Sequence, residues 1–280
     1  MATVFMFPGQ GSQSLGMGGE LFDRYPDLVA EADAILGYSV KELCLENPDR
    51  QLNSTDYTQP ALYIVNAMSF RAKTEDEDVT PDFVIGHSLG EYSALYAAGA
   101  FDFATGLRLV QKRGALMSEA TGGGMAAILG MDGDAVADAL SGLGADRIDV
   151  ANFNSPGQTV ISGLKEDIEV FAPKLKEMGA KRVVILPVSG AFHSRYMRPA
   201  AEEFETFLRG FSFGHLNITC IANCNASPYT DESIAANLVS QIYSSVLWID
   251  TIRSLREKGA EKFIEVGPGT VLSGLARQIK

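Results

Sequence analysis

A serine lies between two glycines in the segment Gly86-His87-Ser88-Leu89-Gly90, an arrangement that can activate a nucleophile. The apolar residues Phe83–Ile85 before it predict a buried strand, and residues 92–98 after it predict a helix. A G-x-S-x-G motif between a strand and a helix places its serine on a sharp, strained turn. The serine then lies at a helix N-terminus, where free N–H groups favour a developing oxyanion. We therefore predict that Ser88 is a nucleophile rather than a serine in an ordinary glycine-rich turn.

A serine nucleophile needs a base, and histidine is the usual choice. The chain has three histidines. His87 is adjacent to Ser88 on an extended segment, so its side chain should point away and pack structurally. His215 lies in Phe213-Gly214-His215-Leu216, which is typical of a surface connection. His193 is the candidate base by elimination, and the alternative is a hydrogen-bonded core histidine.

The third member of a catalytic triad is not evident from the sequence. Four acidic residues are candidates: Asp149, Glu166, Asp250 and Glu265. A backbone carbonyl can orient the imidazole instead of a carboxylate. The sequence leaves this choice open.

An arginine stands on the apolar face of a helix that we predict over residues 104–119. The apolar arc consists of Leu107, Leu109, Val110, Gly114, Leu116 and Met117. Arg113 falls in the middle of this arc, where a guanidinium is costly unless it is paired. One interpretation is a structural buried ion pair. The other is a receptor for a substrate carboxylate, which the planar fork of arginine can bind with two hydrogen bonds.

Composition restricts the class of protein. The 280 residues, 46% hydrophobic and 21% charged, are typical of a soluble globular protein. A net charge of −12 argues against nucleic acid as the main partner. No apolar run reaches the roughly 18 residues of a membrane span, and the N-terminus has no basic signal-peptide region. Cys44, Cys220 and Cys224 lack metal or paired-disulfide spacing, so we expect no metal site and a cytoplasmic location.

Strands that alternate with helices predict an α/β fold with a mainly parallel central sheet. Residues 125–188 follow the order strand, helix, strand, strand, helix, strand, which is the ferredoxin-like βαββαβ motif. We therefore expect a large domain from residues 1–124 and 189–280, with residues 125–188 as an inserted small subdomain. Within this scheme, residues 74–78 should be a solvated acidic connector and residues 165–178 a single helix.

A first predicted strand, residues 3–7, leads into the loop Pro8-Gly9-Gln10-Gly11-Ser12-Gln13. The loop fits neither common phosphate-binding pattern, because Ser14 stands where a dinucleotide motif needs glycine and Met17 stands where a P-loop needs lysine. It can still present backbone N–H groups beside the sheet.

Seven motifs in order resemble the malonyl-CoA:acyl carrier protein transacylase family, and the resemblance runs from residue 5 to residue 279. The motifs are Phe7-Pro8-Gly9-Gln10-Gly11-Ser12-Gln13, Thr58-Gln59-Pro60-Ala61, Gly86-His87-Ser88-Leu89-Gly90-Glu91, Gln111-Lys112-Arg113-Gly114, Asn154-Ser155-Pro156, Gly190-Ala191-Phe192-His193-Ser194 and Glu265-Val266-Gly267-Pro268-Gly269. Residues 37–44 and 56–63 look most like the free-standing, trans-acting acyltransferases that serve modular polyketide synthases.

The resemblance implies a hydrolase-like large domain with a ferredoxin-like insert. It also implies transfer of a malonyl group from malonyl-CoA to the phosphopantetheine thiol of an acyl carrier protein through an ester on Ser88. In this scheme His193 is the base, the backbone N–H groups of Gln10 and Leu89 hold the oxyanion, and Arg113 binds the malonyl carboxylate.

Two further residues take roles by resemblance. Phe192 precedes the base and implies a preference for malonyl over branched malonyl units. A backbone carbonyl before the tryptophan orients the family's histidine, and we assign this role to Leu247. No cofactor is implied, since the coenzyme A thioester is a substrate. The partners implied are malonyl-CoA and an acyl carrier protein, without nucleic acid or membrane.

Two alternative functions remain. An acyl hydrolase that clears carrier proteins has no use for the carboxylate receptor at Arg113. A catalytically silent docking subunit of a synthase has no use for an intact Ser88 and His193.

The residues between 172 and 198 are strongly basic. They include one acid, Glu177, and six basic residues: Lys174, Lys176, Lys181, Arg182, Arg195 and Arg198. We expect this stretch to border the cleft and to steer an acidic carrier protein, and the alternative is a solvated helix face.

Overall fold

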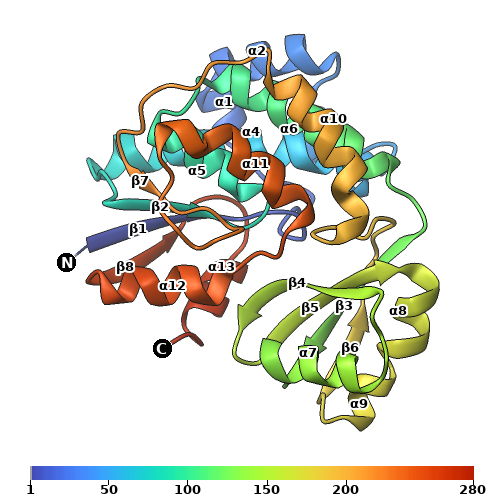
Figure 1. Cartoon of the computed structure of the whole chain (residues 1–280). Coiled ribbons are helices and arrows are strands. Elements are labelled where there is room, and N and C mark those ends of the chain that lie inside the picture. The colour runs from blue at the N-terminus through green and yellow to red at the C-terminus, as the bar shows by residue number, and fades with distance from the viewer. Residues whose placement is uncertain (1) are drawn as a thin grey trace.

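Strand β1 (Ala2–Phe7) lies inside the main sheet of the computed structural model, which describes residues 2–280 (Figure 1). It pairs in parallel with β2 (Phe83–Gly86) and with β8 (Ala260–Glu265), and β7 (Thr219–Cys220) pairs with β2. Phe5 and Phe7 pack into one apolar cluster, while Val4 and Met6 pack into another. The alternation shows that the sheet is buried on both faces, as expected of a parallel sheet.

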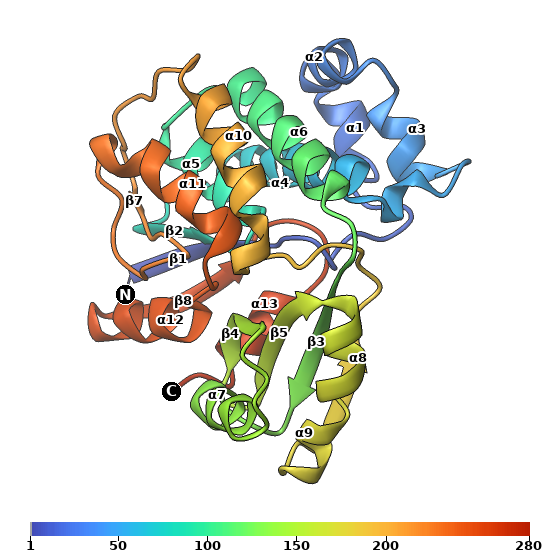
Figure 2. The same ribbon diagram turned by 45° about the vertical axis from the view of Figure 1, so that its right-hand side comes forward.

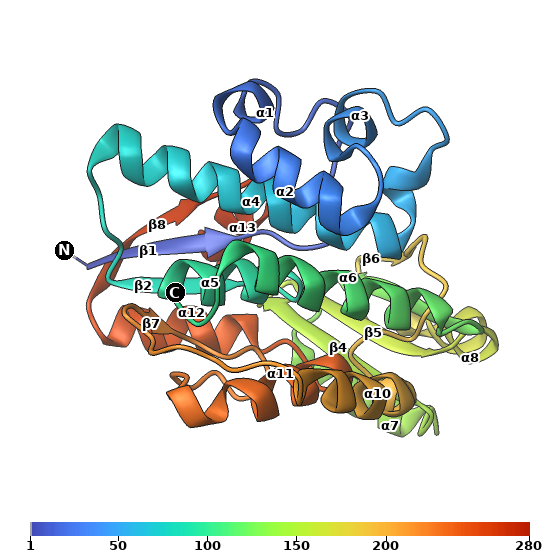
Figure 3. The same cartoon turned by 90° about the horizontal axis from the view of Figure 1, so that it is seen from above.

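Helices cover both faces of this sheet, and α4 and α6 lie side by side (Figure 3). The cluster around Phe5 and Phe7 includes α1 (Leu21–Arg24), α2 (Pro26–Leu36), α3 (Val40–Leu45), α4 (Thr55–Glu77), α5 (Gly90–Ala98), α6 (Phe103–Glu119), α10 (Arg198–Leu208) and α11 (Ile234–Tyr243). The cluster around Val4 and Met6 includes α12 (Trp248–Glu257) and α13 (Val271–Ala276). Short 3₁₀ turns are η1 (Gln51–Asn53), η2 (Arg195–Met197) and η3 (Asp231–Ser233). No helix within residues 2–280 is long and apolar enough to cross a membrane.

The segment of the chain that follows α6 and precedes η2 forms a second, antiparallel sheet (Figure 2). Its elements are β3 (Gly123–Leu129), α7 (Gly133–Gly142), β4 (Ile148–Ser155), β5 (Gln158–Leu164), α8 (Lys165–Phe171), α9 (Lys174–Glu177) and β6 (Arg182–Ile185). The strand order β4-β5-β3-β6 is that of a ferredoxin-like βαββαβ unit. The predicted fold class is therefore confirmed. We call residues 123–185 the small subdomain, and the boundaries at 124 and 188 stay predictions.

The small sheet has two different faces. Ala126 and Ile128 pack against α7, α8 and α9. Met125, Ala127 and Val160 belong instead to the cluster of the large domain, so this face of the sheet is turned toward it.

Two expected segment boundaries are wrong. Residues 74–78 are not a connector, because α4 continues to Glu77. Glu75 and Asp76 accept hydrogen bonds from Arg24 at 3.0 and 2.7 Å, and these exposed ion pairs join the end of α4 to α1. Residues 165–178 are not one helix, since Pro173 lacks an N–H and separates α8 from α9.

Candidate active site

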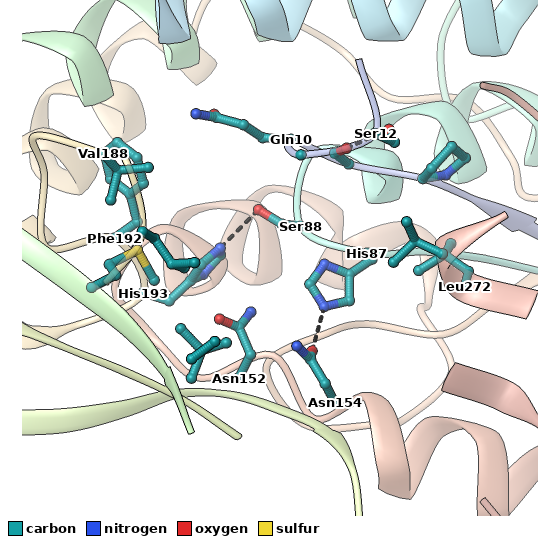
Figure 4. Close-up of a pocket in the computed structure, with 18 of the residues that line it drawn as sticks. Gln10, Ser12, His87, Ser88, Asn152, Asn154, Val188, Phe192, His193 and Leu272 are labelled. Carbon is teal, nitrogen blue, oxygen red and sulfur yellow. Dashed lines mark hydrogen bonds between the residues drawn. The ribbon is translucent and has the colours of Figure 1, made fainter. Parts of the chain in front are cut away.

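Loops from three strands meet at the carboxyl edge of the parallel sheet. Gln10 follows β1, Ser88 follows β2 and Asn223 follows β7. Open α/β sheets bind their ligands at this edge. A cavity of about 400 Å³ lies here between the large domain and the inner face of the small sheet, and its walls include Gln10, Ser88 and Asn152 (Figure 4).

The turn that carries Ser88 is strained and held in place. Ser88 has a left-handed backbone conformation with φ of 51°, which is rare for residues other than glycine. A Cβ at Gly86 would lie 1.9 Å from the carbonyl carbon of Gly90, so the turn needs glycine there. Asn223 Oδ1 accepts from the Ser88 N–H at 2.8 Å, and Asn223 Nδ2 donates to the Gly86 carbonyl at 2.7 Å. The predicted strand, turn and helix are all present around Ser88.

Ser88 and His193 point toward each other, with 2.7 Å between Oγ and Nε2 (Figure 4). The other ring nitrogen, Nδ1, lies 2.9 Å from the Gln241 carbonyl oxygen and 3.2 Å from that of Ser244. Since carbonyls only accept hydrogen bonds, Nδ1 carries the hydrogen and Nε2 is free to accept from the Ser88 hydroxyl. Burial, aided by the Arg113 charge, lowers the pKa of His193 to about 3 and keeps the imidazole neutral.

The assignment of the orienting carbonyl to Leu247 is wrong. The Leu247 carbonyl accepts hydrogen bonds from the N–H and Oγ1 of Thr251 in α12. Gln241 and Ser244 lie instead at the end of α11, where carbonyls have no partner within the helix and remain available to His193.

None of the four candidate acids is hydrogen-bonded to His193 in the part of the chain that the structure describes. Asp149 pairs with Arg195, Glu166 lies 3.8 Å from Arg147, Asp250 is exposed, and Glu265 accepts from the N–H groups of Leu272 and Ser273. Backbone carbonyls, and not a carboxylate, therefore orient the His193 imidazole.

The other two histidines lie apart from this pair. His87 Nε2 lies 2.8 Å from Asn154 Oδ1 on β4 (Figure 4). The centroid of the His87 ring is 5.5 Å from that of Trp248. His87 thus connects the Ser88 turn to the small subdomain. His215 is exposed, and its Nδ1 lies 2.7 Å from Asp231 Oδ2. The hydrogen bond with this carboxylate raises the pKa of the His215 imidazole.

Arg113 is only 1% exposed, and its hydrogen-bond partners within residues 2–280 include no carboxylate. Its Nη1 donates to Gln59 Oε1 at 2.7 Å, and its Nη2 donates to Gln241 Oε1 at 2.9 Å and to Ser88 Oγ at 3.2 Å. Within residues 2–280 all three partners are neutral, so the interpretation as a buried ion pair is wrong. A buried cation without a directly bonded counter-ion is costly, and burial lowers the pKa of this guanidinium, while the charge of nearby Glu91 acts in the opposite direction. An anionic group bound beside Ser88 would compensate the charge.

Two backbone N–H groups are available near Ser88. Those of Gln10 and Leu89 donate no hydrogen bond within residues 2–280. The loop after β1 reaches the Ser88 turn because Gly9 has no side chain; a Cβ there would lie 2.2 Å from the His87 carbonyl oxygen. The arrangement is suited to an oxyanion on a group bonded to Ser88.

Phe192 lines the cavity beside His193 (Figure 4). It is buried, and a Cβ at Gly190 would lie 2.3 Å from its ring, so the backbone fixes the ring on that side. An aromatic wall therefore stands in the same cavity as Ser88 and His193.

The chain is similar to known proteins along nearly its whole length. The model of the family described as "Acyl transferase domain" matches residues 4–278. The chain belongs to this family. The acyl transferase is 56% identical over 280 residues to the polyketide biosynthesis malonyl CoA-acyl carrier protein transacylase BaeC of Bacillus velezensis, with 99% of this chain and 96% of BaeC covered. It is 55% identical over 278 residues to PksC of Bacillus subtilis, which has the same description and the same coverage.

Solved structures of transacylases have the same fold. The crystal structure of a malonyl CoA-acyl carrier protein transacylase from Burkholderia pseudomallei has a TM-score of 0.95 and 46% identity, covering 100% of this acyl transferase and 98% of that chain. A malonyl-transacylase in complex with the type II polyketide synthase acyl carrier protein AntF has a TM-score of 0.95 and 39% identity, covering 100% and 93%.

Sequence reasoning missed four residues that hold the acyl transferase's site together. They are Gln59, Glu91, Asn223 and Gln241. Gln241 could have been found, since it shares the buried face of α11 with Ile234, Leu238 and Ile242. A polar residue on an apolar helix face is the same signal that identified Arg113. Asn223 follows a two-residue strand and has no comparable signal.

The basic stretch does not border the acyl transferase's cavity as one unit, and the expectation is wrong for Lys174 and Lys176. Both are on α9, at the end of the small subdomain remote from the large domain (Figures 1 and 2). Arg195 is paired with Asp149, and Arg198 lies over the Tyr243 ring, 4.5 Å from its centroid.

Proposed function

We propose that the acyl transferase moves a malonyl group from malonyl-CoA to the phosphopantetheine thiol of an acyl carrier protein, in polyketide biosynthesis. The observation that carries the proposal is the Arg113 guanidinium, which lies 3.2 Å from Ser88 Oγ and is bonded to no carboxylate within residues 2–280. An acyl group with a terminal carboxylate, esterified to Ser88, would supply the missing counter-ion. The descriptions of BaeC and PksC and the carrier protein complex support the same activity.

In the first half-reaction the Ser88 oxygen attacks the thioester carbon of malonyl-CoA. Its proton passes to His193 Nε2, while Nδ1–H stays bonded to the carbonyls of Gln241 and Ser244. The oxyanion is held by the N–H groups of Gln10 and Leu89, and one such donor typically contributes about 3 kcal/mol. The carbon–sulfur bond then breaks, and the coenzyme A thiolate takes the proton from His193.

The second half-reaction reverses these steps with a different thiol. The phosphopantetheine thiol gives its proton to His193 and attacks the Ser88 ester. Collapse of the tetrahedral intermediate breaks the ester bond, and His193 returns the proton to Ser88 Oγ. One neutral histidine thus serves both directions. The proposal needs no cofactor, and the location proposed for the enzyme is the cytoplasm.

Selection for malonyl follows from two walls of the site. Arg113 favours an acyl group with a carboxylate, since its fork can bind both carboxylate oxygens. The buried Phe192 ring lines the cavity, so we expect it to disfavour a methyl branch on the α-carbon of the acyl group.

Two alternatives have less support. An acyl hydrolase would gain nothing from a buried cation beside its nucleophile. A silent docking subunit would not need the 2.7 Å contact between Ser88 and His193.

Intact-protein mass spectrometry after mixing with malonyl-CoA tests the proposal. We expect one malonyl adduct, lost on addition of carrier protein with its phosphopantetheine arm and retained in buffer. Rapid loss of the adduct in buffer would indicate a hydrolase, and absence of an adduct would contradict any acyl transfer from malonyl-CoA.

A further inference from the structure

Glu91 is a fully buried carboxylate that the mechanism above does not use. Its Oε1 accepts from the backbone N–H of Asn223 at 3.0 Å and from the Tyr229 hydroxyl at 2.6 Å. Its Oε2 accepts from Gln241 Nε2 at 2.7 Å. Burial is costly for this group and raises its pKa to about 7.

Gln241 joins Glu91 to the reacting residues. Its Nε2 faces two acceptors, Glu91 Oε2 and the Ser88 carbonyl oxygen, each at 2.7 Å. Its Oε1 therefore faces the other way, toward Arg113 Nη2 at 2.9 Å. If this amide were reversed, an NH₂ group would face the guanidinium, and two donors would meet.

The orientation of this amide decides how Arg113 presents its fork. Gln59 Oε1 accepts a hydrogen bond from Arg113 Nη1, and Gln241 Oε1 accepts one from Arg113 Nη2. Each terminal nitrogen keeps one further N–H, and the remaining one on Nη2 is directed at Ser88 Oγ. A carboxylate bound beside Ser88 would need these two hydrogens. Loss of the Gln241 acceptor would free the guanidinium to rotate away.

We propose that Glu91 is a positioning residue for binding of the acyl carboxylate. It fixes the orientation of the Gln241 amide, and this amide orients the Arg113 guanidinium. The inference rests on the proposed function, because it gives Glu91 a role in recognising the malonyl group. It differs from a purely structural role, which would change stability without changing the choice between acyl groups.

Glu91→Gln tests this inference at nearly constant volume. An amide offers oxygen on one side only, and two donors, Asn223 N–H and Tyr229 OH, compete for it against one from Gln241. The new NH₂ group would therefore face Gln241 Nε2, two donors would meet, and the Gln241 amide would be displaced from the position in which its oxygen meets Arg113. We expect the ratio of malonyl to acetyl acylation rates, measured with the two CoA esters, to fall about tenfold, the typical effect of one hydrogen bond to a charged group.

Tyr229→Phe is the matched control. It removes a donor to Oε1 of Glu91 and leaves the contact with Gln241 in place, so the ratio should stay within twofold of wild type. A double-mutant cycle with Gln241→Ala tests the route, because Glu91→Gln should have no further effect on the ratio when Gln241 is absent.

The inference is overturned if Glu91→Gln leaves the ratio of malonyl to acetyl acylation rates unchanged. It is also overturned if Glu91→Gln still lowers this ratio in the Gln241→Ala background, or if Tyr229→Phe lowers it as much as Glu91→Gln does. If Glu91→Gln does not fold, Gln241→Met removes the amide at similar volume and should reduce the ratio as well; an unchanged ratio there overturns the inference. A wild-type protein that accepts no malonyl contradicts the proposed function too, whereas normal acylation with an unaffected ratio contradicts the role of Glu91 alone.

Discussion

The Nη2 atom of Arg113 lies 3.2 Å from Oγ of Ser88, so a buried cation and the proposed nucleophile are neighbours. Within residues 2–280 the guanidinium is held by two glutamine oxygens and is bonded directly to no carboxylate; Glu91 is linked to it only through the Gln241 amide. In a malonyl ester of Ser88, only one methylene would separate the ester carbonyl from the carboxylate. In the proposed reaction this short spacing would bring the malonyl carboxylate to the Arg113 guanidinium.

Arg113→Ala should change the choice of acyl group and not only weaken binding. Without the guanidinium a malonyl carboxylate would be buried unpaired, which typically costs several kcal/mol. Acetyl, which has no charge, should be relatively favoured. The measurement is the acylation rate with malonyl-CoA and acetyl-CoA in the wild type and the variant. Arg108→Ala, an exposed arginine of the same helix, is the matched control, and an equal malonyl-to-acetyl ratio in all three proteins would make Arg113 structural.

Ser88→Ala should abolish the acyl adduct, because no ester oxygen is left. Intact-protein mass spectrometry with malonyl-CoA measures this directly. Ser93→Ala is a suitable control, since Ser93 is a buried serine of α5 that is bonded to Asn66 and not to His193. An adduct that survives in Ser88→Ala would place the nucleophile elsewhere.

Phe192→Ser should narrow the preference for malonyl over methylmalonyl. The aromatic ring stands beside His193 in the cavity, and one methylene-sized clash typically changes selectivity by about 1–3 kcal/mol. Competition between the two CoA esters, followed by mass spectrometry of the adducts, gives the ratio. If the wild type already accepts both esters at equal rates, Phe192 does not select the α-substituent.

Local patterns were enough to predict the fold class and the strained turn that carries Ser88. The turn at Ser88 depends on residues within a few positions, and the parallel sheet follows from the alternation of strands and helices. Arg113 was identified because a charge on an apolar helix face is visible in the sequence. Its partners, Gln59 and Gln241, lie 54 and 128 positions away, so the sequence could not distinguish an ion pair from a receptor.

Prediction failed where long-range contacts decide the structure. The carbonyls that orient His193 belong to Gln241 and Ser244, and a carbonyl has no side-chain signature. The basic residues of α9 are near His193 in the sequence but at the remote end of the small subdomain in space. Sequence proximity was a poor guide there because β6 returns along the length of the sheet.

The burial of His193 should be visible in the pH dependence of stability. Its pKa is about 3 in the folded protein and about 6.5 when it is exposed, because burial disfavours the charged imidazolium. Below pH 6.5 the unfolded chain binds a proton that the folded chain does not, so the stabilisation is present above pH 6.5 and is lost as the pH falls toward 3. Compared with a variant that lacks this group, the wild type should lose about 1.4 kcal/mol more free energy of unfolding between pH 8 and pH 5.5.

His193→Asn is the appropriate variant for this measurement. His193 has a φ of 56°, and asparagine tolerates this left-handed conformation better than most residues. His87 and the carboxylates titrate in both proteins, so their contributions cancel in the difference. Urea unfolding of both proteins at pH 5.5, 6.5 and 8 gives the two curves. Parallel curves would show that His193 keeps an ordinary pKa, and that the contacts with Gln241 and Ser244 do not hold it as a neutral base.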